Sequence, residues 1–171
     1  MGIKVKAHVD LSGLKHLRKA IKESQKTSGN GPFRRCYKRW AYRFLVYLQR
    51  RFNKMSRGGW APLKKATIRR RRGGGKGAKI LVDTGTLRTA LSPGMKGIPG
   101  QLNKAIPWGQ RVGYGGPTSH PKAKYTIAML AHMHNTGAGT LPKREIIVDP
   151  DQATLNGMAR DAKQAIQESI E

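Results

Sequence analysis

The chain has 171 residues, of which 34 are Lys or Arg and nine are Asp or Glu, so its formal net charge is +25. Hydrophobic residues make up 37% of it, enough apolar material for one folded core. So large a positive charge opposes compaction unless a polyanion or an acidic surface neutralises it, and it is not the composition of an ordinary metabolic enzyme. We therefore expect a single domain over residues 1–171 that acts on nucleic acid or on acidic proteins.

The charge is distributed unevenly along the chain. Residues 24–82 contain 18 basic residues and no acidic one, and residues 84–144 contain eight more basic residues and again no acid. From residue 145 onward the balance reverses, with six acidic residues against two basic ones. An acidic final segment can neutralise the basic body within one subunit or between neighbouring copies.

The sequence shows no signal for secretion or membrane insertion. Cys36 is the one cysteine and cannot form an internal disulfide, and residues 1–10 lack the apolar stretch of a signal peptide. No segment approaches the roughly 18 apolar residues that a membrane span needs. We expect a soluble protein that folds in a reducing cytoplasm and has no membrane partner.

The first third of the chain predicts a strand and two helices. Apolar and polar residues alternate over residues 3–9, as in a half-buried strand, and a helix follows in which Leu14, Leu17 and Ile21 share one face. Over residues 33–55 aromatic and aliphatic residues recur every three or four positions, which is the strongest helical pattern in the chain.

We interpret the aromatic stripe of this long helix as core and Cys36 as a small buried filler. The opposite face is basic, and we expect it to be a solvated surface or an interface. Its residues are Arg34, Arg35, Lys38, Arg39, Arg43, Arg50, Arg51 and Lys54.

Residues 56–79 predict a long flexible basic loop. Gly58, Gly59, Pro62 and the three glycines 73–75 prevent a long regular element. Successive arginines next to glycines can follow a phosphate backbone without reading bases, and contact with acidic protein surfaces is an equal alternative. The expected contact residues are Lys64, Lys65, Arg69, Arg70, Arg71, Arg72, Lys76 and Lys79.

The middle of the chain predicts short elements. Residues 83–91 indicate a turn that leads into a short helix, and residues 106–108 and 110–114 indicate short strands. Residues 124–135 indicate a short helix or strand, and residues 146–148 a buried strand.

Residues 149–171 predict an acidic C-terminal helix with Pro150 in its first turn. Its expected apolar face consists of Leu155, Met158, Ala159, Ala162, Ile166 and Ile170. Together the elements predict an α+β fold, in which a small antiparallel or mixed sheet packs against the long amphipathic helix and the C-terminal helix.

No catalytic or metal-binding pattern stands out. His132 and His134 would share a face if they lay in a strand, but further ligands are missing nearby, so they are most simply packing or surface residues. The glycine-rich residues 72–79 lack the spacing of a phosphate-binding loop. Asp83 is the one acidic residue between Glu23 and Glu145, so a carboxylate pair would need distant segments to converge. We expect no enzyme, cofactor, metal or small-molecule substrate.

Four short stretches, taken in order over residues 59–148, resemble the bacteriophage virion morphogenesis family of tail completion proteins. The first is Trp-x-Pro-Leu followed by a threonine, and the second is Leu-x-x-Thr-Gly-x-Leu-Arg. The third is a tyrosine followed by His-x-x-Gly, and the fourth is Pro-x-Arg before a hydrophobic stretch. The matching residues are Trp60, Pro62, Leu63, Thr67, Thr84, Gly85, Leu87, Arg88, His134, Gly137, Pro142 and Arg144.

The chain departs from the family pattern in two places. Glu145 and Ile146 stand where Pro-Phe is usual, and the Gly/Pro-rich stretch 93–121 is longer than expected. Within the pattern, we expect Trp60, Pro62 and Leu63 to form a packing anchor and residues 84–88 a structured turn and helix start.

The resemblance implies a structural protein at the neck of the virion that completes or caps the tail and helps to join it to the DNA-filled head. It further implies a ring of copies of the chain, a hexamer in our expectation, in contact with tail-tube, tail-terminator and head-tail connector proteins and nonspecifically with packaged DNA. The location would be the virion, and the host cytoplasm during assembly. The alternative is a free, sequence-nonspecific nucleic-acid-binding protein of ribosomal or nucleoid type, which the charge alone suggests.

Overall fold

The computed structural model describes residues 12–24, 26, 30–70, 79–94, 97–139 and 141–170. The expected strand over residues 3–9 lies outside the described residues. The fold is α+β, as predicted, with a two-stranded antiparallel sheet, a long helix and a C-terminal helix. Its elements are α1 (Ser12–Ser24), α2 (Pro32–Lys54), the π-helical turn η1 (Met55–Gly59), α3 (Lys65–Arg70), α4 (Thr86–Thr89), β1 (Gln101–Ile106), β2 (Gly109–Tyr114), α5 (Ile127–Thr136) and α6 (Gln152–Gln167).

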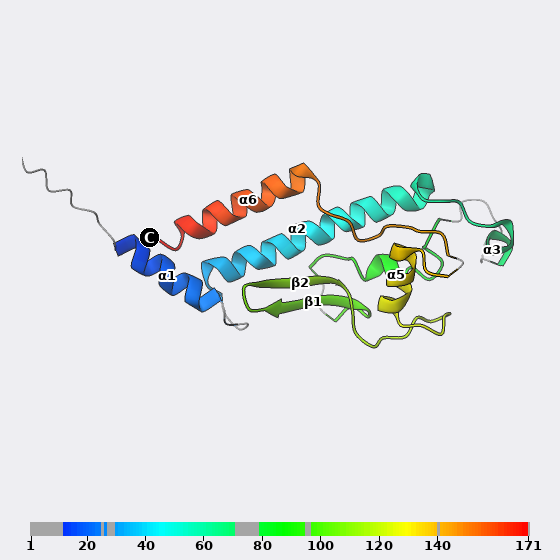
Figure 1. The fold of residues 1–171 in the computed structure, drawn as a ribbon, viewed down its shortest axis with the longest axis horizontal. Helices are drawn as coiled ribbons and strands as arrows, with labels where there is room; N and C mark the ends of the chain where they lie inside the picture. The colour runs from blue at the N-terminus through cyan, green and yellow to red at the C-terminus, as the bar shows by residue number, and fades with distance from the viewer. Residues whose placement is uncertain are drawn as a thin grey trace, which may run out of the picture.

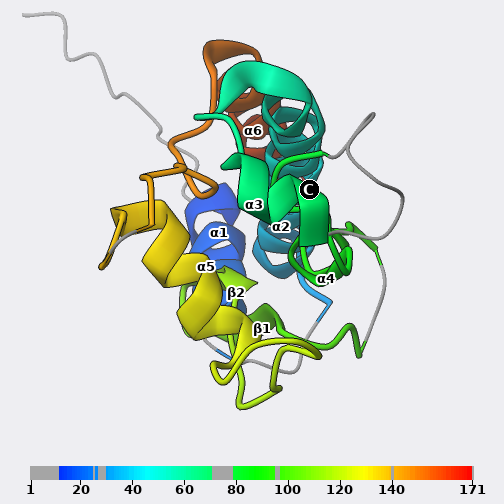
Figure 2. The ribbon, with the colours of Figure 1, turned by 90° about the vertical axis from the view of Figure 1, so that its right-hand side faces the viewer.

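Helix α2 is the central element of an elongated molecule (Figure 1). Helix α6 runs antiparallel to it along its N-terminal half, and the β hairpin lies on the opposite side of α2, an arrangement that Figure 2 repeats from the end of the molecule. Pro32 in the first turn starts α2, where a missing amide hydrogen costs nothing. The prediction of this helix from its periodicity is confirmed.

The main core lies where α2 meets the hairpin, α4 and α5. Leu45, Leu48 and Phe52 of α2 are at most 1% exposed and pack with Leu91 and Ile127, which are equally buried. Cys36 is also buried, and this burial raises the pKa of its thiol to about 11. The interpretation of Cys36 as a buried filler is therefore confirmed. That of the stripe as core is confirmed for its C-terminal part, whereas the aromatic residues at its start, Phe33, Tyr37 and Trp40, are half-buried and lie outside this core.

The hairpin corrects one of the predicted strands. Ile106 pairs with Gly109, so Pro107 and Trp108 form a two-residue turn, and β1 begins earlier, at Gln101. Trp108 has a φ of 61°, a left-handed value that suits a turn and not a strand. The expected strand over residues 106–108 is wrong, whereas the strand expected over residues 110–114 is confirmed as β2.

The predicted strand over residues 146–148 is not formed. The amides of Ile146 and Ile147 instead donate to the side-chain oxygen Oδ1 of Asn135, at 2.8 and 2.9 Å. A side chain therefore satisfies two backbone donors that a neighbouring strand would otherwise bind. Ile146 is nevertheless buried, as the sequence predicted.

The C-terminal helix begins three residues later than expected, at Gln152, and ends at Gln167. Asp151 is its N-cap, and its carboxylate accepts a hydrogen bond of 2.9 Å from the amide of Thr154. Pro150 therefore precedes the helix and does not lie in its first turn. The Asp151 side chain satisfies the amide of Thr154, which has no partner within the helix, and this cap places the start of the helix at Gln152.

Helix α6 also turns a different face toward α2 from the one predicted. Gly157, Asp161 and Ala165, four positions apart, are its buried residues. A Cβ atom on Gly157 would lie 3.1 Å from Nη1 of Arg43, so glycine there permits the close approach of the two helices. Leu155, Ile166 and Ile170 of the predicted apolar face remain 43%, 44% and 47% exposed.

Within the described residues, no helix is both long and apolar enough to cross a membrane.

Candidate functional site

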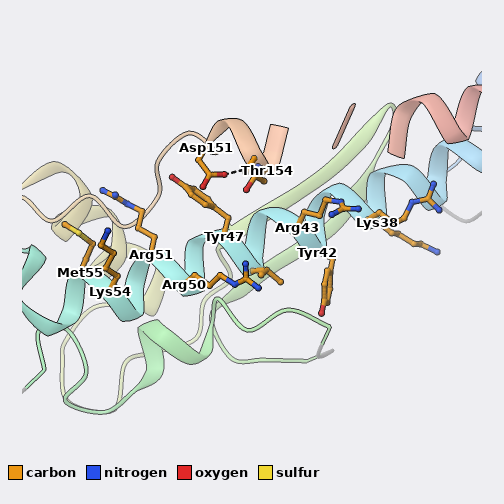
Figure 3. Close-up of a pocket in the computed structure, with 13 residues that line it drawn as sticks. Lys38, Tyr42, Arg43, Tyr47, Arg50, Arg51, Lys54, Met55, Asp151 and Thr154 are labelled. Carbon is orange, nitrogen blue, oxygen red and sulfur yellow. Dashed lines mark hydrogen bonds between the residues drawn. The ribbon is translucent and has the colours of Figure 1, made fainter. Parts of the chain in front are cut away.

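A groove of about 1030 Å³ runs along α2 beside the beginning of α6 (Figure 3). Six of its lining residues are basic, and Asp151 is its one acidic residue. The basic residues are Lys38, Arg39, Arg43, Arg50, Arg51 and Lys54. We call this surface the α2 groove. Much of the basic face predicted for the long helix therefore lines a hollow in the molecular surface.

Two of these cations are already paired inside the subunit. The Nε and Nη2 atoms of Arg43 lie 2.7 and 3.1 Å from the two carboxylate oxygens of Asp161, and Nε of Arg39 lies 3.5 Å from one of them. The hydrogen bond to Asp161 raises the pKa of Arg43. Among the described residues, no carboxylate lies within 4 Å of a side-chain nitrogen of Lys38, Arg50, Arg51 or Lys54.

The one carboxylate of the groove is engaged locally. Hydrogen bonds from Thr154 to Asp151 at the start of α6 lower the pKa of Asp151, so the group stays ionised near neutral pH. In Figure 3 Tyr47 points toward Asp151, whereas Tyr42 points away from it, on the other side of α2. Tyr42 is 53% exposed. The α2 groove therefore offers positive charge and one exposed aromatic ring.

Arg34, which we expected on the basic surface, is 1% exposed. Its Nη1 donates to the carbonyl of Gly109 at 2.8 Å, and its Nη2 donates to the carbonyls of Lys26 and Ile106 at 2.9 and 3.1 Å. The guanidinium of Arg34 therefore connects the hairpin turn to the start of α2 through hydrogen bonds. The expectation of a solvated surface or interface is wrong for this residue.

The acidic C-terminal segment neutralises part of the basic body within the subunit. Besides Asp161, Glu168 pairs with Arg35 of α2, which lowers the pKa of Glu168. The indole nitrogen of Trp40 also donates to the carbonyl of Met158 at 2.8 Å. Two carboxylates and one backbone carbonyl of the C-terminal segment therefore bind side chains of α2 across the seam between α2 and α6.

Helix α3, which carries part of the set expected to contact DNA or acidic partners, lies at the other end of the molecule from the C-terminus. Lys64, Lys65 and Arg69 are exposed on or beside α3, Arg70 belongs to α3, and Lys79 is exposed. Arg71, Arg72 and Lys76 lie outside the described residues. None of the described residues of this set lines the α2 groove.

The first motif stretch forms a packing anchor in part. Trp60 is 6% exposed and meets the ring of Phe52 edge to face, with the ring centroids 5.2 Å apart. Leu63 packs against the core, but Pro62 and Thr67 are exposed. The expectation is therefore wrong for Pro62, because the chain runs along the surface between Trp60 and Leu63.

The second motif stretch forms the expected turn and helix start. Gly85 has a φ of 76° at the N-cap of α4, a value that favours glycine. Leu87 is buried, and its carbonyl accepts a hydrogen bond of 2.8 Å from the hydroxyl of Tyr114. Arg88 is exposed.

Thr84 contacts an imidazole, but the contact does not create a nucleophile. Its Oγ1 lies 3.0 Å from Nε2 of His120, and Nδ1 of that ring accepts the amide of Lys122 at 3.1 Å. Because Nδ1 accepts, the proton of the neutral ring is on Nε2, which therefore donates to Thr84. A ring that donates to the hydroxyl is not its general base.

The structure also separates the two histidines that a strand would have placed on one face. They lie in helix α5, where His132 is exposed and His134 is 8% exposed. Burial and the charge of Arg144 lower the pKa of His134 to about 4. The part of the chain that the structure describes contains no cluster of three or more potential metal ligands.

Three of the four motif stretches meet at Arg144. This residue is 4% exposed, its amide donates to the carbonyl of His134 at 2.7 Å, and its Nη2 donates to the carbonyl of Ala61 at 3.3 Å. Gly137 ends α5 with a φ of 78°, and a Cβ there would lie 3.2 Å from the backbone of Lys143. Pro142 is half-buried. Residues far apart in the sequence therefore build one structural unit.

Comparison of the chain with protein-family models, with curated proteins and with solved structures found no match.

Proposed function

We propose that this protein is a non-enzymatic structural component of a bacteriophage neck, which completes or caps the tail and helps to join it to the DNA-filled head. The observation that carries the proposal is the meeting of Trp60–Leu63, the His134–Gly137 turn and Arg144 in one unit. Stretches that resemble a family in the sequence are expected to converge in space when they encode a common fold. Their convergence supports the resemblance independently of each short match.

Two surfaces support a role in assembly. Leu155 and Ile166 of α6, and Ile170 just after it, are large apolar residues at the surface, which an assembly interface could cover. The basic surfaces suit packaged DNA or acidic partner proteins. We propose tail-tube, tail-terminator and head-tail connector proteins as partners, together with copies of the chain in a closed ring, because heterologous contacts close into rings when the rotation permits.

The test is a null mutant of the phage that encodes the chain, examined by electron microscopy of the lysate. We expect DNA-filled heads and free tails to accumulate unjoined, and a plasmid copy of the wild-type gene to restore joined particles. Normal joined particles in the null mutant would contradict the proposal.

The α2 groove favours a second candidate, a free, sequence-nonspecific nucleic-acid-binding protein. The two functions differ in what the purified chain does on its own. A neck protein is expected to form oligomers or to bind tail and connector components. A monomer that binds RNA and duplex DNA tightly, and none of those components, would favour the second candidate.

A further inference from the structure

We propose that the α2 groove binds the phosphate backbone of duplex DNA without reading its sequence. The α2 groove is separate from the basic loop over residues 56–79, for which the sequence predicts contact with either DNA or acidic protein surfaces. It deepens the proposed function, on which its setting in a virion rests, by naming a DNA-contacting surface. DNA binding by the groove does not itself depend on a role in the virion.

The charge of the α2 groove suits a polyanion. Lys38, Arg50 and Lys54 are exposed, and none has a carboxylate of the described residues within ion-pairing distance. Asp161 holds Arg39 and Arg43 in place, so the middle of the groove is ordered before any ligand arrives. A ligand that brings regularly spaced negative charges would meet cations unpaired within the described residues at both ends of the groove and, in its middle, two guanidinium groups that share one carboxylate.

The length of the cationic stretch on α2 suits a rigid ligand with regularly spaced negative charges. Lys38 and Lys54 lie in one uninterrupted helix, so the cations extend over about 24 Å at a rise of roughly 1.5 Å per residue. At roughly 3.4 Å per phosphate on each strand, that length corresponds to about seven base pairs. Helix α6 and the hairpin flank the N-terminal half of α2 and hinder its entry into the major groove there, so we expect the contacts to reach the backbone and not the base edges.

The composition of the groove argues against the other polyanions. The centres of protein–protein interfaces are depleted in lysine and in charge, whereas protein–DNA interfaces are strongly positive. Single-stranded nucleic acid is bound on successive aromatic platforms. Here Tyr42 is exposed, but Tyr47 is half-buried and stacked on Phe44. Duplex DNA is therefore the ligand that the groove fits best.

The experiment compares two triple variants of the full chain that lose the same charge. The first is Lys38→Ala/Arg50→Ala/Lys54→Ala in the α2 groove. The matched control is Lys104→Ala/Arg111→Ala/Lys124→Ala, three exposed cations on the hairpin and the segment after it. Binding to a fluorescent duplex of about 20 base pairs is measured by anisotropy between about 50 and 200 mM salt. Circular dichroism and thermal unfolding establish that both variants fold.

We expect the groove variant to flatten the dependence of log K on log salt by about three, since each lost phosphate contact lowers the slope by roughly 0.9. At the lower salt its affinity should fall at least tenfold more than that of the control. Equal losses in the two variants would overturn the site, because the binding would then follow net charge alone. Equal affinity for a single strand, or displacement of the duplex by polyglutamate at equal charge, would overturn the choice of ligand.

Failure of this experiment and failure of the proposed function are distinguishable. A null mutant that leaves heads and tails unjoined, together with a groove variant that binds DNA normally, would reject the DNA site and keep the neck role. A null mutant that assembles normally, together with loss of DNA binding in the groove variant, would reject the neck role and keep the DNA site.

Discussion

Arg43 and Asp161 form a two-point ion pair across the seam between α2 and α6, at 2.7 and 3.1 Å. The side chain of Asp161 is 6% exposed and that of Arg43 is 41% exposed, so the two partners differ in how well water can replace the contact. The face of α6 that carries Asp161 therefore lies against α2, while Leu155 and Ile166 of the same helix are 43% and 44% exposed.

The asymmetry of this pair predicts unequal effects of removing either partner. Arg43→Ala leaves a buried carboxylate with only Arg39 beside it and should lower the free energy of unfolding by about 3 kcal/mol. Asp161→Asn leaves cations that can turn to solvent and should cost about 1–2 kcal/mol. Urea unfolding at neutral pH measures both, and the exposed Lys163→Ala in α6 is the control. Losses no larger than that of the control would show that the pair does not hold the helices.

Removal of the Arg34 guanidinium should loosen the hairpin turn. Arg34→Ala leaves three backbone carbonyls without this donor and should cost about 3 kcal/mol or more. The exposed neighbour Arg35→Ala should cost at most about 1 kcal/mol, because its ion pair with Glu168 lies at the surface. Amide hydrogen exchange at residues 106–109 locates the effect. Unchanged protection there in Arg34→Ala would contradict the role assigned to this residue.

His134 should make the fold less stable in mild acid. Its pKa is about 4 in the folded chain against an ordinary value of 6.5, so the folded state favours the neutral ring. Its stabilising contribution is complete above pH 6.5 and is lost as the pH falls toward 4, by about 3 kcal/mol in total. Unfolding free energies over this range should decline less steeply in His134→Gln. The exposed His132→Gln should follow the wild type, and parallel curves for all three proteins would refute the prediction.

The two tryptophans at opposite extremes of burial should respond differently to truncation. Trp60→Ala removes a ring that packs edge to face on Phe52 and should cost about 3–5 kcal/mol. Trp60→Phe should lose less, because it also removes an indole nitrogen that is buried without a hydrogen-bond partner. Trp108→Ala, at a residue that is 50% exposed, should change stability by less than about 0.5 kcal/mol. Thermal and urea unfolding of the three variants test the order.

Local patterns were sufficient where an element's own residues decide its state. Helix α2 was predictable because its apolar period continues over six turns. The turn at Gly85 was predictable because glycine readily adopts the left-handed conformation that this turn requires. Strand β1 was missed because its residues alternate weakly, and it is a strand through its pairing with β2. Residues 146–148 have the composition of a strand, but the side chain of Asn135 takes their amides.

The candidate site was harder to predict than the fold. Arg34 and Arg35 are neighbours of one type in one helix, and nothing local indicates that one is buried and the other exposed. The α2 groove exists because α6 packs beside α2, and its lining comes from two segments, residues 38–55 and 151–154, that are far apart in the sequence. The one feature of the sequence that could have indicated the pairing of α6 with the basic face of α2 is Asp161, an acidic residue within the apolar pattern of the last helix.

By itself, the sequence determined the composition, the strong positive charge, the α+β class and the long helix, since these follow from residue identity and short-range spacing. The tertiary structure alone decided which cations are buried, which are paired and which line a groove. Burial and ion pairing depend on which distant segments pack against one another, and the local spacing of residues does not specify that packing.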